Sequence, residues 1–308
     1  MLDASALAPD VLSGRRRAIA RALTAVENGL PGAGALVDAL YPSTGRSWRI
    51  GVTGPPGAGK STLTDRLVEA FRQRGDRVAV VAVDPSSPFT GGALLGDRVR
   101  MDRWAEDDGV FVRSLAARGA LGGLSEATEA ACDVLDAAGY DVVIVETVGV
   151  GQGEIDVAEA TDTTLVVLVP ESGDAVQAMK AGLMEVADVF CVNKADKPEA
   201  GALVRALRAM LHLREIEAPP VVKTSASRGE GIDALAETLD AHRRQLAMSW
   251  DEIRAERLRR RVRRLVEAQW RRDFWGSRGT TLAEALRQLD PEERTPHQLA
   301  SRVLGGGA

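Results

Sequence analysis

The chain has 308 residues, of which 45% are hydrophobic and 27% are charged. This length and composition can bury a core without disulfide or metal staples, so whole-chain disorder is not expected. The formal net charge is −5, from 39 basic and 44 acidic residues, which argues against broad electrostatic capture of nucleic acid or an anionic membrane. The two cysteines and three histidines form no CxxC or HExxH pattern, so neither a disulfide scaffold nor a Cys/His zinc site is expected.

The N-terminus lacks the basic region and apolar block of a secretory signal peptide. No run of residues approaches the roughly 18 apolar positions that span a bilayer. We therefore expect a cytoplasmic protein that has neither a membrane nor a nucleic acid as its partner.

Residues 1–45 are predicted to form a helical N-terminal extension. One helix is indicated by Ile19, Leu23 and Val26, which recur at helical spacing. A second, shorter helix is predicted over residues 36–40, after the Gly- and Pro-containing breaks that follow the first.

Apolar runs that are typical of buried parallel strands then alternate with segments of helical character. The predicted strands cover residues 48–53, 77–83, 110–112, 141–146, 164–169, 188–192 and 220–224. The clearest predicted helices cover residues 63–74, 125–138, 175–186 and 200–211. This alternation predicts an α/β domain over residues 46–240, built on a doubly wound, mostly parallel sheet. Such sheets bind ligands at the carboxyl ends of their strands.

Residues 241–308 carry no strand signal and are predicted to form a helical C-terminal arm. The stretch 243–272 fits one long helix or two, and residues 257–264 are densely basic. The pattern is compatible with a solvated helix face, with an arm that packs on a partner subunit, and with nucleic-acid binding.

Residues 54–61 match the phosphate-binding pattern G-x-x-x-x-G-K-[ST], between a predicted strand and a predicted helix. Glycines let backbone N–H groups converge on phosphate oxygens. Lys60 supplies a point charge for the β- and γ-phosphates, and the Ser61 hydroxyl is placed to ligate Mg²⁺. The predicted phosphate-binding residues are Gly54, Pro55, Pro56, Gly57, Ala58, Gly59, Lys60, Ser61 and Thr62.

Asp84 and Glu146 end two neighbouring apolar runs. Carboxylates at these strand ends can hold Mg²⁺, directly or through its waters, beside a triphosphate. We therefore expect both to act with Lys60 in catalysis and both to serve as metal ligands. The alternative for each is a helix cap or a turn residue.

Residues 146–149 resemble the E/D-x-x-G element of GTPases, in which the glycine N–H senses the γ-phosphate. Gly149 is accordingly a predicted nucleotide-binding residue. Gln152 is a candidate for orienting the attacking water. It does not directly follow the glycine, because Val150 holds the position where Ras-type enzymes carry their glutamine.

A guanine-recognition pattern, N-K-x-D, follows the strand that ends at residue 192. The Asp196 carboxylate can accept the N1–H and 2-amino hydrogens of guanine, a pair that adenine does not present. The Lys194 stem can cover the base, and Asn193 can fix the loop. At the next strand end, Ser225, Ala226 and Ser227 resemble the S-A element that closes over guanine O6, for which a plain polar turn is the alternative.

With these residues in place, the sequence resembles the MeaB/ArgK family of P-loop GTPases, which belongs to the SIMIBI class. The resemblance rests on residues 54–62, 84–101, 146–154 and 193–196. It implies that Ser61, Asp84, Asp97 and Glu146 occupy the family's magnesium and switch positions. It also implies a first switch over 84–101, a second over 146–154, and a further mobile element over 174–180 that includes Lys180.

The resemblance implies GTP and GDP as bound nucleotides, Mg²⁺ as the metal, and a homodimer built through the C-terminal arm. It implies a chaperone cycle in which hydrolysis gates adenosylcobalamin loading and protection of a B12-dependent acyl-CoA mutase, methylmalonyl-CoA mutase in the first instance. Hydrolysis is expected to be slow alone and faster with the partner. No D-x-H-x-x-G pattern is present, so we expect no cobalamin bound by the chain itself.

Three other functions remain open at this point. One is insertion of another metallocofactor, such as nickel, although the Cys and His clusters of those GTPases are absent. The second is a kinase of the older ArgK type acting on a transport protein, which would have no use for N-K-x-D. The third is a non-hydrolysing scaffold that uses the basic arm.

Overall fold

The computed structural model describes residues 2–85, 103–117, 126–147, 153–170, 183–212, 218–288 and 295–305. These residues divide into two compact units, 1–253 and 254–308.

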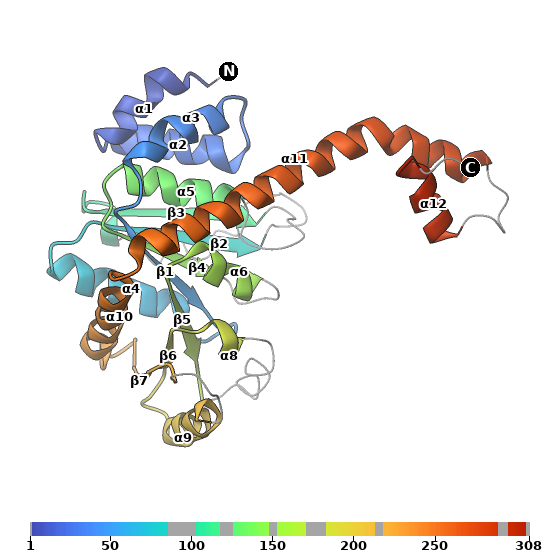
Figure 1. Cartoon of the computed structure of the whole chain (residues 1–308). Helices are drawn as coiled ribbons and strands as arrows, with labels where there is room; N and C mark the ends of the chain where they lie inside the picture. The colour runs from blue at the N-terminus through green and yellow to red at the C-terminus, as the bar shows by residue number, and fades with distance from the viewer. Residues whose placement is uncertain are drawn as a thin grey trace. The chain divides into compact units, whose positions relative to one another are not determined.

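The first unit contains a seven-stranded sheet in the order β3-β2-β4-β1-β5-β6-β7 (Figure 1). Every neighbouring pair of these strands is parallel. The strands are β1 Trp48–Thr53, β2 Val78–Pro85, β3 Val110–Ala117, β4 Val142–Thr147, β5 Thr163–Leu168, β6 Val189–Val192 and β7 Val221–Lys223. The predicted α/β fold with a parallel sheet is therefore confirmed, and each predicted strand is present with ends shifted by a few residues.

Helices cover both faces of the sheet, as a doubly wound fold requires (Figure 1). One face packs against α4 (Lys60–Gln73) and α10 (Ile232–Leu246). The other face packs against α5 (Glu126–Ala137) and α6 (Gly153–Ala160), and, nearer β7, against α8 (Leu183–Val186) and α9 (Ala200–Leu211). β1, β4, β5 and β6 are buried along their whole length, which is why β4, β5 and β6 carry runs of consecutive apolar residues rather than alternation.

Three N-terminal helices pack over α5: α1 (Ala4–Leu12), α2 (Arg16–Glu27) and α3 (Ala33–Leu40). The two predicted helices correspond to α2 and α3, and α1 was not predicted. α1 is short and contains Pro9, which removes a backbone donor and masks the helical pattern. The Asp3 carboxylate caps its first turn by accepting the Ala6 N–H at 3.1 Å.

A buried carboxylate on α5 anchors the chain where it enters the sheet. Asp136 accepts backbone N–H groups from Gly45 (2.6 Å), Arg46 (3.1 Å) and Ser47 (3.0 Å). One turn earlier, Asp133 pairs with the Arg49 guanidinium of β1 at 2.7 Å. The start of β1 and the residues just before it are therefore held to α5 by two α5 carboxylates, in addition to the hydrogen bonds of the sheet.

α10 continues past residue 240, the boundary that we expected between the central domain and the arm. Leu235, Ala236 and Leu239 pack in the core, and the helix runs on to Leu246. α11 then spans Trp250–Gln288, so the division between the compact units falls within its first turn, after Ile253.

The second unit consists of α11 from residue 254 onward and α12 (Pro296–Val303). Among the residues described there, Val303 is the one buried hydrophobic side chain. Exposed apolar side chains recur along α11 at helical spacing: Leu258, Val262, Val266 and Trp270. None of the helices in the described part of the chain combines the length and apolar character needed to cross a bilayer.

Candidate nucleotide-binding site

The phosphate loop joins β1 to α4, and its lysine is held inside it. Lys60 is the first residue of α4 and is 6% exposed. Its Nζ donates to the Gly54 carbonyl at 2.8 Å and to the Pro55 carbonyl at 3.0 Å. The ammonium group is thus fixed beside the loop and the N-terminus of α4, where the charge of a bound phosphate would be neutralised.

Gly59 closes the phosphate loop in a conformation that favours glycine. Its φ is +81°. A Cβ built on Gly59 would lie 2.7 Å from Asn193 Nδ2. The loop therefore requires glycine here for two reasons, backbone conformation and close approach of the base-binding loop.

Ser61 and Glu146 meet at the carboxyl ends of adjacent strands. The Ser61 hydroxyl donates to Glu146 Oε1 at 2.6 Å, and the register pairs Val52 of β1 with Glu146 of β4. A hydroxyl and a carboxylate oxygen are ligands that Mg²⁺ accepts, together with water and phosphate oxygens. The two side chains therefore fit the predicted metal site.

Of the two other predicted metal ligands, Asp84 and Asp97, only Asp84 lies within the described residues. Asp84 lies in β2, next to β4, where Val83 pairs with Thr147, so its backbone is at the same edge of the sheet. Asp97 lies outside the described residues, as do Gly149, Gln152 and Lys180. Within the described ranges no three His, Cys, Asp or Glu side chains gather as a metal cluster. A magnesium site does not need one, because Mg²⁺ keeps several waters and binds substrate phosphates.

Asn193 connects the base-binding loop to the phosphate loop. Its Nδ2 donates to the Ala58 carbonyl at 2.9 Å. Its Oδ1 accepts the Thr224 hydroxyl and the Ala226 N–H, both at 3.1 Å. The side chain is buried, so one amide fixes three loops relative to one another.

The Asp196 carboxylate is held ready to accept hydrogen bonds. The Ser225 hydroxyl donates to Asp196 Oδ1 at 2.8 Å, and Arg228 lies 3.6 Å from Oδ2. The hydrogen bond from Ser225, with a contribution from Arg228, lowers the pKa of Asp196 below its ordinary value. An ionised carboxylate accepts and does not donate, which is the state that guanine N1–H and 2-amino groups require.

A cavity of about 310 Å³ lies where these loops converge. Its wall is formed by Gly59, Thr62, Asn193, Lys194, Asp196, Lys197, Ala226 and Ser227. The structure therefore brings together residues from the phosphate loop, the N-K-x-D motif and the S-A element. Lys197 was not predicted, and its position directly after the motif is the only signal that pointed to it.

Comparisons with known proteins identify the family. The family model described as methylmalonyl-CoA mutase-associated GTPase MeaB matches residues 19–278. The chain belongs to the MeaB family. The protein of Pyrococcus abyssi named "Putative GTPase PYRAB02490" is 46% identical over 308 aligned residues, covering 96% of this chain and 95% of that protein. GTPase ArgK of Escherichia coli is 42% identical, covering 72% of this chain and 70% of that protein.

A solved structure agrees with this assignment over the full length of the chain. The crystal structure of a LAO/AO transport system kinase is 27% identical, with a TM-score of 0.75 and 99% of each chain covered. The MeaB-family resemblance and the P-loop α/β fold are both confirmed.

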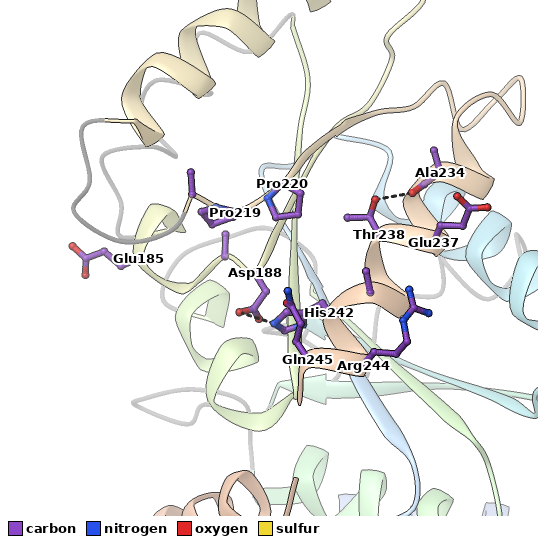
Figure 2. A pocket seen from close by; sticks show the side chains of 13 residues that line it. Glu185, Asp188, Pro219, Pro220, Ala234, Glu237, Thr238, His242, Arg244 and Gln245 are labelled. Carbon is purple, nitrogen blue, oxygen red and sulfur yellow. Dashed lines mark hydrogen bonds and ion pairs between the residues drawn. The ribbon is translucent and has the colours of Figure 1, made fainter. Parts of the chain in front are cut away.

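This MeaB family member also has a larger cavity, of about 910 Å³, away from the nucleotide site. Asp188 and Pro220, which immediately precede β6 and β7, line it with α10. It therefore lies at the amino ends of the strands, on the opposite edge of the sheet from the phosphate loop. Figure 2 shows the side chains of Asp188 and His242 next to each other in its wall, with His242 Nε2 3.5 Å from Asp188 Oδ1.

The side chains at this second cavity resemble a hydrolytic triad but cannot act as one. His242 Nδ1 lies 2.9 Å from Thr163 Oγ1, and that oxygen also accepts Trp48 Nε1–H at 2.8 Å. Thr163 is completely buried, so a substrate has no access to its hydroxyl. Burial raises the pKa of Asp188. These contacts stabilise the packing of α10 on β5.

Proposed function

We propose that this chain binds GTP with Mg²⁺ and hydrolyses it to GDP and phosphate. The observation that carries the proposal is the hydrogen bond from Asn193 Nδ2 to the Ala58 carbonyl. It joins a loop built for phosphate to a loop whose Asp196 carboxylate stays ionised. The loop that would recognise the base and the loop that would bind the phosphates are therefore already in contact with each other.

The residues divide the chemistry of hydrolysis between them. Lys60 and the loop N–H groups would hold the β- and γ-phosphates and neutralise their charge, while Ser61 and Glu146 would hold the metal. When bound, Mg²⁺ offsets the charge that builds on the transferred phosphoryl group. Asp84 and Gln152 are the candidates for completing the metal site and orienting the attacking water. We expect slow hydrolysis by the chain alone.

We further propose that the client is an adenosylcobalamin-dependent acyl-CoA mutase. Support comes from the family, which is described as methylmalonyl-CoA mutase-associated. In this proposal GTP binding and hydrolysis gate cofactor loading and protection of methylmalonyl-CoA mutase, and the mutase completes the catalytic site. The chain itself holds no cobalamin.

A homodimer through the C-terminal arm is part of the same proposal. The apolar stripe of α11 is exposed in a single chain, with Val266 at 61% and Trp270 at 65% exposure. A continuous exposed stripe of this kind is typical of a protein–protein contact.

The decisive experiment follows phosphate release from GTP and from ATP, with Mg²⁺, with and without methylmalonyl-CoA mutase from the same source. We expect GTP-selective release that rises when mutase is added. Preference for ATP would overturn the guanine assignment. GTP-selective release that saturating mutase leaves unchanged would overturn the choice of client while leaving the GTPase proposal standing.

A matched variant tests the base assignment directly. Asp196→Asn replaces an acceptor by an amide whose NH₂ can donate to the O2 of xanthine. We expect the variant to lose activity with GTP and to gain it with XTP. Loss with both nucleotides would contradict the assignment, provided that the variant keeps the wild-type melting temperature.

A kinase function is the second candidate, because the structural relative is described as a transport system kinase. The same experiment discriminates between the two. A kinase would place labelled phosphate on a protein or small acceptor, whereas the GTPase releases it as free phosphate.

A further inference from the structure

One side chain outside the nucleotide cavity contacts the backbone of the loop that closes over the base. Arg66 lies on α4, one helical turn after Thr62, which lines the cavity. Its Nε–H donates to the Ala226 carbonyl at 3.1 Å. Arg66 does not line the cavity itself, and neither the P-loop motif nor the N-K-x-D motif includes it.

The carbonyl that Arg66 holds belongs to the peptide between Ala226 and Ser227. A trans peptide is planar, and its N–H points opposite to its C=O. Because the Ala226 carbonyl points toward the Arg66 guanidinium, the Ser227 N–H points away from that guanidinium. Ser227 lines the cavity, so the orientation of this peptide affects how the loop contacts a ligand there.

The preceding peptide of the same loop is fixed independently. The Ala226 N–H donates to Asn193 Oδ1 at 3.1 Å, and Ala226 itself is 2% exposed. The Ala226 carbonyl also accepts the Gly229 N–H at 3.3 Å within the loop, a longer bond than the one from Arg66. Loss of Arg66 would remove the shorter of the two bonds to this carbonyl and leave the Asn193 bond intact.

Arg66 is oriented by an acidic neighbour on its own helix, Glu69. Its Nη1 lies 3.0 Å from Glu69 Oε2. The hydrogen bond from Arg66 lowers the pKa of Glu69, so the pair is charged at neutral pH. Glu69 also lies 3.4 Å from Arg103, whose Nε donates to Asp65 Oδ1 at 2.9 Å. These contacts position the guanidinium toward the loop.

We propose that Arg66 is a positioning residue for recognition of guanine O6, acting through the peptide that joins Ala226 and Ser227. The inference rests on the proposed function, since it takes the cavity to be a guanine site. Guanine and hypoxanthine present an acceptor oxygen at position 6, whereas adenine presents an amino group. Arg66 therefore affects the affinity for 6-oxopurine nucleotides specifically.

The test measures dissociation constants of the full chain for GDP, IDP and ADP by competition against a fluorescent GDP analogue. For Arg66→Ala we expect GDP and IDP to weaken together by roughly 3- to 10-fold, the range that loss of one hydrogen bond represents. We expect ADP binding to stay unchanged, because the phosphate loop is intact. Arg66→Lys keeps the charge but loses Nε, and should show the same loss.

Arg74→Ala is the matched control. Arg74 caps the same helix and pairs with Asp240 of α10, far along α4 from the Ala226 contact. We expect this variant to lose thermal stability and to keep wild-type nucleotide affinities. Equal weakening in both variants, unchanged affinities in Arg66→Ala, or equal weakening of ADP would each overturn the inference.

Failure of the proposed function gives a different result. A wild-type chain that binds ADP as well as GDP would overturn the guanine site, and the role of Arg66 with it. A wild-type chain that prefers GDP, with an Arg66→Ala variant that matches it, would overturn the role of Arg66 alone.

Discussion

The carboxylate of Asp196, the proposed guanine-binding residue, is stabilised in its ionised form by its neighbours. Ser225 and Arg228 together lower the pKa of Asp196. The favourable interaction of the ionised form is present above the unfolded-state pKa of 3.8 and is lost only as the pH falls through the lower folded value. Asp196 therefore remains an acceptor over the whole range in which the protein is expected to work.

We predict that selectivity for GDP over IDP is constant between about pH 5 and pH 8. The two nucleotides differ only in the 2-amino group that Asp196 would accept, and they share the phosphate titration. Their dissociation constants, measured in parallel, would check this. A ratio that falls toward pH 5 would show that the carboxylate protonates there.

Gly59 is a second residue at which one substitution is expected to disturb the nucleotide site. We predict that Gly59→Ala weakens GDP binding by at least about tenfold, since the added Cβ strains the backbone and displaces the Asn193 amide. Gly57→Ala is the control, because Gly57 also has a positive φ but no atom lies within 4 Å of its Cβ position. Titration of both variants with GDP separates the two causes. Equal losses would assign the whole effect to backbone strain.

At the scale of elements, side chains of α5 fix the segment of chain that leads into the first strand of the sheet, β1. Asp136 accepts three consecutive backbone N–H groups, of which those of Gly45 and Ser47 would otherwise be buried without partners. Asp136 therefore anchors the segment that leads into β1, and no phosphate or base motif includes this residue.

We predict that Asp136→Ala lowers the free energy of unfolding by about 2–4 kcal/mol. Urea denaturation followed by circular dichroism would measure the change. Asp136→Asn keeps one acceptor oxygen and should lose less. If the two variants were equally stable, the three hydrogen bonds would not be the cause.

At the scale of the whole molecule, the two compact units differ in how they are built. Residues 1–253 contain the buried clusters on both faces of the sheet and the described nucleotide-site residues. The described residues from 254 onward contain one buried hydrophobic side chain and an exposed apolar stripe. The first unit has a hydrophobic core of its own, whereas the described part of the second unit consists mainly of exposed helix surface.

We therefore predict that a chain ending at residue 253 folds, binds GDP with wild-type affinity and is monomeric. Circular dichroism, GDP titration and light scattering would check the three properties. A truncated chain that unfolds would show that the arm supports the first unit. A truncated chain that stays dimeric would move the dimer contact off the arm.

Much of the fold and the chemistry could be predicted from local pattern. Apolar runs located the strands because buried parallel strands need no alternation, and the P-loop and N-K-x-D motifs identified their residues because each motif is continuous in sequence. α1 was missed because Pro9 interrupts its pattern. α10 was not predicted as a separate helix, and it runs past residue 240, where we expected the central domain to end.

The sequence by itself determined the type of each ligand group: a loop lysine for phosphate, a hydroxyl and carboxylates for a metal, and an aspartate for guanine. Only the tertiary structure decided which of these groups meet. The strand order places β1 beside β4 and so brings Ser61 to Glu146, and the packing of α4 brings Arg66 to Ala226 across 160 residues of chain. Such contacts leave no local signal, because they depend on strand order and helix packing rather than on neighbours along the chain.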